Sequence, residues 1–391
     1  MKRGQLKIKI PNGQQLLFGE DKDELSAQID ILNWEFFKKC LLYGDIGFGE
    51  SYCEGDWQSP CLKSVISWFI LNIEDSPVGS GSKKKKITLN LMNFKNRIFH
   101  LLRANSKSGS RKNISYHYDL SNDFFQKFLD SSMTYSSGFF NSADCTLEQA
   151  QRNKYQKMAE NLELKRTDHL LEIGCGWGGF SIYCAQNYGC RVTAITISDQ
   201  QFNFAQKKIE QLGLTAQIQL LKQDYRTLKG QFDKIASIEM MEALGDAYVP
   251  VFFEQCHRLL KKDGLLSFQV ITCPDHRYDE FKKGVDWIQK YIFPGSLLLP
   301  VSYLLEQSKE RAQLHLYRFQ DMGIHYAETL RQWYENFNNN RASVRKLGFD
   351  LQFERMWEYY LKYCEAAFFM RNISVVQMTL TKANNLSLKT I

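Results

Sequence analysis

Residues 169–180 read HLLEIGCGWGGF, an apolar run that passes directly into a cluster of glycines. Glycine adopts a positive φ without strain and lets the backbone approach a ligand that a Cβ atom would keep away. The segment therefore predicts a strand over Leu170–Gly174, a ligand-binding loop, and a helix over Gly179–Asn187.

The chain on the carboxyl side of this loop continues the alternation of strands and helices. Strands are expected at residues 191–197, 216–221, 232–238 and 265–271, and helices at residues 198–212 and 247–260. This rhythm predicts a doubly wound α/β domain with a mostly parallel sheet that is covered by helices on both faces. We expect its ligand at the carboxyl ends of the strands, where the strand order reverses.

Two polar segments, SPVGSGSKKKK at 76–86 and ANSKSGSRK at 104–112, have the composition of exposed linkers. They predict a small amino-terminal domain (1–75), a basic linker with an amphipathic helix (76–112) and the main domain (113–391). In the small domain we expect helices at Glu24–Tyr43 and Pro60–Ile73, with a glycine-rich loop at Gly44–Gly55 between them.

The charge of the chain is uneven. The 391 residues hold 50 Lys and Arg against 43 Asp and Glu, yet every acidic or basic residue between Lys83 and Lys112 is basic. A helix near residues 87–103 would place an apolar stripe between basic flanks, which is typical of a helix lying on an anionic membrane surface. A helix packed on its own domain is the alternative. Nucleic acid is not expected, because no motif for binding it is present.

The location of the protein is inferred from its cysteines and its start. The ten cysteines include no C-x-x-C pair, which fits neither a disulfide framework nor a zinc site, and no metal is expected. Residues 1–10 contain no apolar signal-peptide core, and no apolar run reaches the roughly 18 residues of a membrane-spanning helix. We expect a cytoplasmic protein, peripheral at the inner face of the membrane, and a homodimer is compatible with the sequence.

The spacing of the glycine loop favours one ligand over another. Gly174, Gly176 and Gly178 form G-x-G-x-G rather than G-x-G-x-x-G, and Glu172 precedes them. A pyrophosphate needs the helix amino terminus in close reach, whereas S-adenosylmethionine carries no phosphate. The loop therefore favours S-adenosylmethionine. A nicotinamide-dependent enzyme is the alternative, but it would also need an acid after the second strand, where Thr196-Ile-Ser198 stands.

Several further motifs occur in order around this loop. They are HYDLSNDFF at 117–125, LDSSMTYS at 129–136, TISDQQ at 196–201, QDYR at 223–226, WIQKYIFPG at 287–295 and WYE at 333–335. Together with the glycine loop they resemble the cyclopropane fatty acid synthase family, over essentially all of residues 113–391. The resemblance implies a Rossmann-like methyltransferase that transfers the methyl group of S-adenosylmethionine to the double bond of an unsaturated acyl chain in a membrane phospholipid, giving a cyclopropane ring.

The resemblance also implies which residues form the site. Contacts to the methyl donor fall on Tyr135, Ser136, Gly174, Gly176, Gly178, Thr196, Ile197, Gln201, Asp224, Tyr225 and Arg226. In the family the base that closes the ring is thought to be a bound bicarbonate, and its binding positions fall on Ser137, Glu242, Gln269, the backbone of Ile271, and Tyr334.

Two of these positions depart from the family pattern. Ser137 stands where the family has cysteine, and Gln269 stands where it has histidine. Both can form hydrogen bonds, but the ionisable imidazole is lost. A second interpretation is therefore a fatty-acyl C-methyltransferase that yields a methyl- or methylene-branched chain. An amine methyltransferase and a lipid-binding relative without activity are further alternatives.

Overall fold

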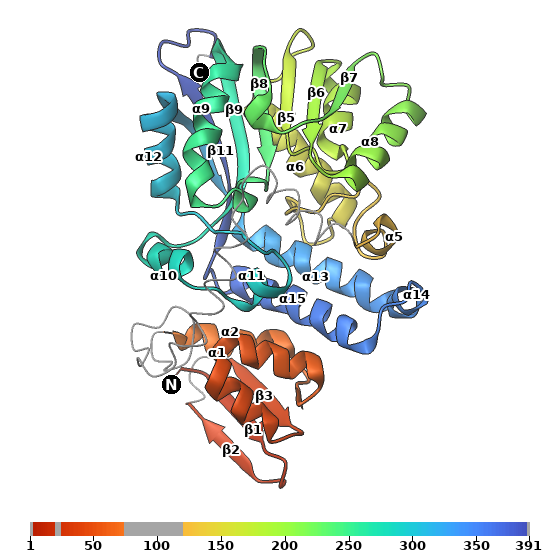
Figure 1. Cartoon of the computed structure of the whole chain (residues 1–391), viewed down its shortest axis with the longest axis vertical. Coiled ribbons are helices and arrows are strands. Elements are labelled where there is room, and N and C mark those ends of the chain that lie inside the picture. The colour runs from red at the N-terminus through yellow and green to blue at the C-terminus, as the bar shows by residue number, and fades with distance from the viewer. Residues whose placement is uncertain (1–2, 20–24, 74–119, 389–391) are drawn as a thin grey trace. The chain divides into compact units, whose positions relative to one another are not determined.

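The computed structural model describes residues 3–19, 25–73 and 120–388 (Figure 1). They form two compact units, each assembled from separate stretches of the chain. The first unit joins the described amino-terminal residues with His276–Pro294 and Ala327–Ile373, and the second joins residues 120–275 with Gly295–Tyr326 and residues 374–388. The boundaries 1–75, 76–112 and 113–391 stay predictions, and the basic segment Lys83–Lys112 lies outside the described residues.

The first unit contains a four-stranded sheet in the order β2-β1-β3-β4. β1 pairs in parallel with β3, whereas β1 with β2 and β3 with β4 are antiparallel pairs. The strands are β1 (Gln5–Lys9), β2 (Gln15–Phe18), β3 (Ser26–Ile31) and β4 (Trp57–Gln58). The helices of this unit are α1 (Glu35–Glu54), α2 (Leu62–Leu71), α10 (Tyr278–Lys283), α11 (Trp287–Tyr291), α14 (Arg341–Lys346) and α15 (Leu351–Phe369).

The expected helix at Pro60–Ile73 is confirmed as α2, but the preceding prediction is wrong. Part of the expected helix Glu24–Tyr43 is strand β3, in which alternate residues are buried, and α1 begins only at Glu35. The expected loop Gly44–Gly55 is also wrong, because α1 runs through it with a kink at Gly44. A Cβ atom on Gly49 would come within 2.5 Å of the Trp287 side chain, so this glycine serves close packing rather than a turn.

The second unit is built on a seven-stranded sheet in the order β10-β11-β9-β8-β5-β6-β7. The strands from β9 to β7 in this order are parallel neighbours, and β11 and β10 add antiparallel strands at one edge. Their bounds are β5 (His169–Ile173), β6 (Arg191–Thr196), β7 (Ile218–Lys222), β8 (Phe232–Ile238), β9 (Leu260–Thr272), β10 (Leu314–Asp321) and β11 (Ser374–Lys382). The mostly parallel, doubly wound sheet is thereby confirmed.

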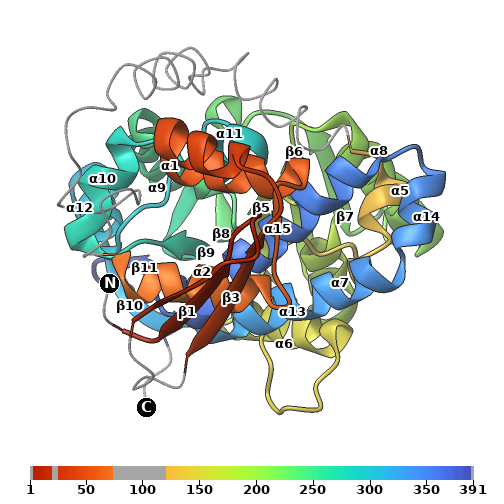
Figure 2. The same ribbon diagram turned by 90° about the horizontal axis from the view of Figure 1, so that it is seen from below.

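Helices cover both faces of this sheet. Figures 1 and 2 show α9 and α12 on one face and α6 and α7 on the other. The bounds are α5 (Asn122–Phe125), α6 (Leu147–Asn161), α7 (Gly179–Tyr188), α8 (Asp199–Gln211), α9 (Val249–Leu259) and α12 (Val301–Ala312). A further helix, α13 (Gly323–Asn339), begins in the second unit and continues in the first.

The strand order reverses beside β5. β6 and β7 lie on one side of it, and β8 and β9 lie on the other. The central strands β5, β6 and β8 are covered on both faces, and their residues Leu170, Leu171, Val192 and Ile235 are fully buried. The loops that follow β5 and β8 therefore border the same space at the carboxyl end of the sheet, where this class of fold binds its ligand.

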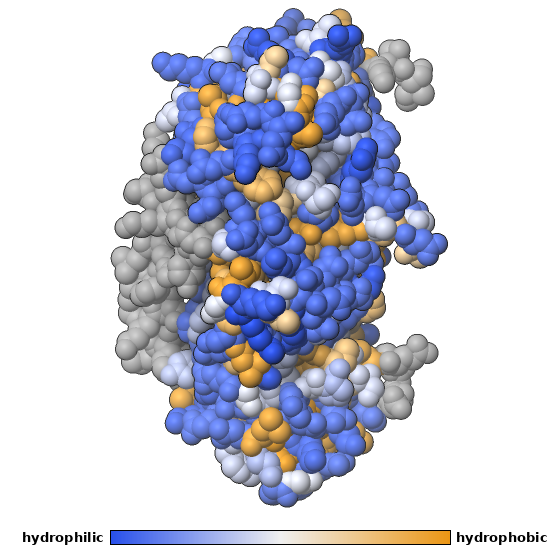
Figure 3. Space-filling view, turned by 90° about the vertical axis from the view of Figure 1, so that its right-hand side faces the viewer, coloured by the Kyte–Doolittle hydropathy of each residue, from blue (hydrophilic) through white to orange (hydrophobic). Residues whose placement is uncertain are grey.

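The surface in view in Figure 3 is largely hydrophilic and carries apolar residues in small separate areas. Within the part of the chain that the structure describes, none of the helices combines the length and the apolar character needed to cross a bilayer.

Candidate functional site

The glycine loop follows β5 and is tied to the end of β6. The backbone amides of Gly174 and Cys175 both donate to the Ile195 carbonyl oxygen, at 3.0 and 2.9 Å. Gly176 has a φ of 53°, and a Cβ atom placed on it would meet no atom within 4 Å. The backbone at Gly176 therefore borders open space that a ligand can fill. Gly178 instead precedes α7, and a Cβ atom on it would come within 3.2 Å of Ala205.

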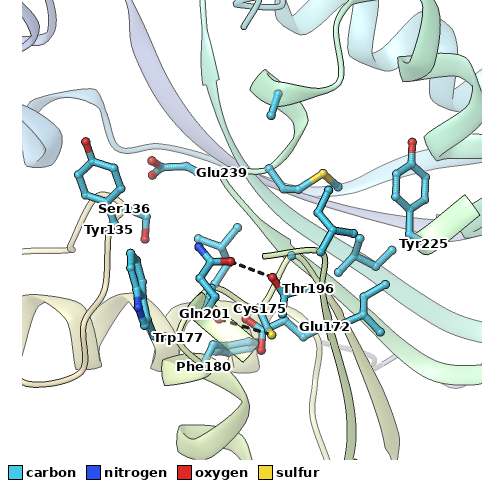
Figure 4. A pocket seen from close by; sticks show the side chains of 18 of the residues that line it. Tyr135, Ser136, Glu172, Cys175, Trp177, Phe180, Thr196, Gln201, Tyr225 and Glu239 are labelled. Atoms are coloured by element: carbon cyan, nitrogen blue, oxygen red, sulfur yellow. Dashed lines mark hydrogen bonds between the residues drawn. The ribbon is translucent and has the colours of Figure 1, made fainter. Parts of the chain in front are cut away.

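One pocket gathers the residues predicted to contact the methyl donor (Figure 4). Gly178 does not line it, because it packs at the start of α7. The predicted donor contacts that do line it come from the loop before α6, the glycine loop, the end of β6, the start of α8 and the segment after β7. They are Tyr135, Ser136, Gly174, Gly176, Thr196, Ile197, Gln201, Asp224, Tyr225 and Arg226.

The polar groups of this pocket are held in place before any ligand binds. Thr196 Oγ1 donates to Gln201 Oε1 at 2.8 Å, as the dashed line in Figure 4 shows. The Asp224 carboxylate accepts from Nε and Nη2 of Arg226, at 2.9 and 2.6 Å. The Tyr225 hydroxyl is buried and has no hydrogen-bond partner among the described residues. Such an unpartnered group fits a polar ligand, and S-adenosylmethionine carries suitable ribose, adenine and amino-acid groups.

Two buried charged side chains lie in the wall of the pocket. Glu172 accepts a hydrogen bond from Ser181 Oγ, and burial raises the pKa of its carboxyl to about 7. Lys154 on α6 donates from Nζ to Ser136 Oγ at 2.7 Å, and burial lowers the pKa of its ammonium group to about 8. Charged groups interact strongly in such a water-poor environment.

The structure brings four of the predicted base-binding residues together in two pairs. Gln269 Nε2 donates to the Ser137 carbonyl oxygen at 3.3 Å. The Ile271 backbone amide donates to Glu242 Oε1 at 2.5 Å. Tyr334 belongs to the first unit, where its hydroxyl donates to Glu358 Oε1 at 2.9 Å.

Sequence reasoning missed two residues at this place, Glu239 and Tyr326. The Glu239 carboxylate accepts from the Ser137 backbone amide at 2.9 Å and from Gln269 Nε2 at 2.7 Å, both on Oε1. Its Oε2 accepts from the Tyr326 hydroxyl at 2.8 Å. Glu239 directly follows β8, and this position at a strand end was a signal that the sequence offered. Nothing in the sequence placed Tyr326 beside it.

A bicarbonate ion does not fit these donors as they stand. The Ser137 amide and the Gln269 side chain are engaged by Glu239, and the Ile271 amide is engaged by Glu242. The Ser137 hydroxyl donates to the Gly138 carbonyl oxygen at 3.0 Å. The Glu239 carboxylate of the chain thus accepts from donors that the family resemblance assigned to an external anion.

The two glutamates differ in how their charge is stabilised. Burial raises the pKa of Glu239 above its usual value, and its three hydrogen bonds and the nearby Lys154 ammonium reduce this rise. Glu242 receives one hydrogen bond on Oε1, and its buried Oε2 has no partner among the described residues. Burial and the charge of Glu239 raise the pKa of Glu242 to about 8. The hydrogen bonds therefore stabilise the charged form of Glu239 better than that of Glu242, so that Glu242 is the carboxyl of the two that more readily holds a proton.

Comparison with known proteins identifies the family. Residues 105–378 match the family model described as mycolic acid cyclopropane synthetase. The chain belongs to this family. The resemblance to cyclopropane fatty acid synthases is confirmed, and the mycolic acid cyclopropane synthetase family consists of S-adenosylmethionine-dependent lipid methyltransferases.

Two relatives and a solved structure agree with this assignment. Tuberculostearic acid methyltransferase UfaA1 of Mycobacterium tuberculosis is 36% identical over 87% of this chain and 79% of its own length. Cyclopropane-fatty-acyl-phospholipid synthase of Escherichia coli is 35% identical over 91% of this chain and 88% of its own length. The structure of mycolic acid cyclopropane synthase CmaA1 complexed with SAH and CTAB is 30% identical, with a TM-score of 0.63 over 70% of this chain and 98% of its own.

Proposed function

We propose that this protein transfers the methyl group of S-adenosylmethionine to the double bond of an unsaturated acyl chain of a membrane phospholipid, giving a cyclopropane fatty acyl chain. The observation that carries the proposal is that the pocket beside the glycine loop holds a carboxylate, Glu239, in its wall, where it accepts three hydrogen bonds. A methyl transfer to nitrogen or oxygen of a substrate needs no base at carbon. A transfer to an alkene does, because the cation that forms on the acyl chain must lose a proton from carbon.

The walls of the pocket suit this reaction. An alkene is a poor nucleophile, so it must meet the methyl group in line and away from water, which would capture the carbocation that follows. Ile173, Ile195 and Ile238 line the pocket with apolar side chains, and the aromatic rings of Tyr135 and Trp177 also line it. Aromatic faces stabilise a cation without reacting with it.

The substitutions at Ser137 and Gln269 are the reason to consider a second product as the alternative. If a hydride shifts to the cation before the methyl group loses its proton, the electron pair forms a carbon–carbon double bond and a methylene-branched chain results. The relatives include both a cyclopropane synthase and a methyltransferase named for tuberculostearic acid. We therefore keep a fatty-acyl C-methyltransferase that yields a branched chain as the alternative within the same proposal.

The substrate implies a place of action. Acyl chains of phospholipids lie in a bilayer, so the protein must work at a membrane surface. We propose that the basic segment Lys83–Lys112, which lies outside the described residues, binds anionic lipid at the inner face of the membrane.

The experiment combines the purified protein with vesicles of an unsaturated phospholipid and S-adenosylmethionine that carries a fully deuterated methyl group. Mass spectrometry of the recovered acyl chains should show an added one-carbon group that has lost one deuterium, and proton NMR separates ring from methylene products. Vesicles of a saturated phospholipid are the control. If no label enters the acyl chains of the unsaturated lipid, the proposed function is wrong.

A further inference from the structure

Glu239 occupies an unusual position in the chain. It directly follows β8 and has a φ of 47°, in the left-handed region that favours glycine. A non-glycine residue is kept in such a conformation when the surrounding structure requires its side chain there. Figure 4 shows the Glu239 side chain extending toward Tyr135 and Ser136, in the wall of the pocket that gathers the predicted contacts to S-adenosylmethionine.

Three elements of the second unit supply donors to the Glu239 carboxylate. The Ser137 amide comes from the loop before α6, the Gln269 amide comes from β9, and the Tyr326 hydroxyl comes from the start of α13. These donors are of the kinds that would hold a small carboxylate-like anion. They hold the carboxylate of this chain instead.

A second layer of hydrogen bonds orients the Gln269 side chain. Gln269 Oε1 accepts from Gln377 Nε2 at 3.0 Å, and Gln377 Oε1 accepts from Asn161 Nδ2 at 3.0 Å. Because the Gln269 oxygen faces Gln377, its NH₂ group faces Glu239. Gln269 and Gln377 are direct partners on the paired strands β9 and β11. The amide that replaces the family's histidine is thus fixed as a donor to an anion.

We propose that the Glu239 carboxylate is the catalytic base, standing in the place where the family resemblance implied bicarbonate. This inference rests on the proposed function and goes beyond it, because it assigns the proton acceptor and removes the need for an external ion. Glu242 is then the neutral neighbour, and Ser137, Gln269 and Tyr326 are positioning residues that act through Glu239.

The step balances with groups that are present. The alkene forms a bond to the methyl carbon while the bond from that carbon to sulfur breaks, and the electron pair stays on sulfur. Glu239 then takes a proton from the added methyl group and becomes a carboxylic acid. The electron pair of that C–H bond closes onto the neighbouring cationic carbon and forms the ring, or forms the methylene double bond when a hydride has shifted first.

The test compares two substitutions at Glu239 with the same substitutions at Glu163. Glu239→Gln keeps the shape and removes the negative charge, and Glu239→Gly removes the side chain at a φ that glycine tolerates. Glu163 is the matched control because it too has a positive φ, of 48°, and its side chain is also a hydrogen-bond acceptor. It accepts a hydrogen bond from the Tyr317 hydroxyl at 3.0 Å, and it does not line the pocket.

Glu239→Gln should lower turnover at least about 100-fold, the usual contribution of a positioned acid–base group, with affinity for S-adenosylmethionine within about threefold of the wild type. A deuterated methyl donor should slow this variant more than it slows the wild type, because proton removal then limits the rate. Added formate or bicarbonate should partly restore Glu239→Gly. Wild-type turnover should not change when bicarbonate is removed from the buffer. The Glu163 variants should keep the wild-type rate.

The opposite results would overturn the inference. The inference is wrong if Glu239→Gln keeps its turnover, or if this variant loses affinity for S-adenosylmethionine by the same factor as turnover. It is also wrong if a folded Glu239→Gly variant is not restored by any added anion, or if wild-type turnover depends on bicarbonate. A wild type that transfers no methyl group to any acyl chain would instead refute the proposed function, so the two failures are distinguishable.

Discussion

The side-chain amide of Gln269, on strand β9, donates to Glu239 Oε1 at 2.7 Å. Glu239 lines the pocket that gathers the predicted contacts to S-adenosylmethionine. A histidine in this place could share a proton with a bound anion. The amide cannot, so it can only stabilise the ionised form of a carboxylate that is already there. The replacement at Gln269 and the presence of Glu239 are therefore parts of one arrangement.

Tyr326→Phe should shift the acid limb of the pH–rate profile. The Tyr326 hydroxyl donates to Glu239 Oε2 at 2.8 Å, and losing this donor raises the pKa of Glu239 because the anion is less well stabilised. Activity needs the anion, so the limb should move to higher pH, by up to about one unit for one hydrogen bond. Tyr317→Phe removes a similar hydrogen bond to Glu163 and is the control. If the acid limb shifts equally in both variants, or shifts in neither, Glu239 is not the base.

Gly176→Val should abolish binding of S-adenosylmethionine without unfolding the protein. The Cβ atom would enter the open space of the pocket, and the φ of 53° strains any branched residue. Gly213→Val is the control for strain, since Gly213 has a φ of 68° and equally open surroundings but lies outside the pocket. Calorimetry measures donor affinity and thermal unfolding measures stability. A folded Gly176→Val variant with unchanged affinity would show that the donor binds elsewhere.

The five parallel strands of the second unit could be predicted because a buried parallel strand is a short apolar run with turn residues after it, whereas this rule did not predict the antiparallel strands β10 and β11. The same rule failed in the first unit, at Glu24–Tyr43. Ala27, Ile29 and Ile31 are buried in alternation, which is a strand pattern, but the helix-forming residues after them obscured it. The glycines of Gly44–Gly55 were interpreted as a loop, and only the packing of Gly49 against Trp287 shows why a helix needs them.

The donor contacts of the site could be predicted for a related reason, since most of them follow strand ends or belong to the glycine loop. The tyrosine that donates a hydrogen bond to Glu239 could not be predicted. Tyr326 and Tyr334 lie on the same helix, α13, and the motif around Tyr334 was the more conspicuous in the sequence. Which hydroxyl reaches Glu239 depends on how that helix leaves the sheet, and no local pattern encodes this.

Replacing Lys83–Lys86 with serine should weaken binding to anionic vesicles by two orders of magnitude or more, at about 1 kcal/mol for each basic residue near the surface. Binding should also fall as salt is added. Serine at Lys207, Lys208, Lys261 and Lys262 changes the net charge equally and is the control. Vesicle sedimentation with and without anionic lipid measures the effect. Equal binding to neutral and anionic vesicles would show that this segment does not direct the protein to the membrane.

Glu242→Gln should remove a loss of folding stability that the wild type shows as the pH rises. Burial and the charge of Glu239 raise the pKa of Glu242 from 4.5 to about 8 in the folded protein. Between these values the folded state holds a proton that the unfolded state has released, so the stability contributed by Glu242 is complete below about 4.5 and is lost as the pH rises toward about 8. Glutamine keeps the neutral form at every pH. The free energy of unfolding of the wild type, measured with urea, should therefore fall relative to that of Glu242→Gln by a few kcal/mol between pH ~5 and pH ~8.

The control for this measurement is Glu148→Gln, since Glu148 is an exposed glutamate at the start of α6 in the same unit. Its difference from the wild type should stay nearly constant over the same range. Glu172 also carries a raised pKa, of about 7, but it is present in the wild type and in both variants, so its contribution cancels. Parallel stability curves for the wild type and Glu242→Gln would mean that Glu242 is ionised in the folded protein. Glu239 would then lack the neutral neighbour that the assignment of the base includes.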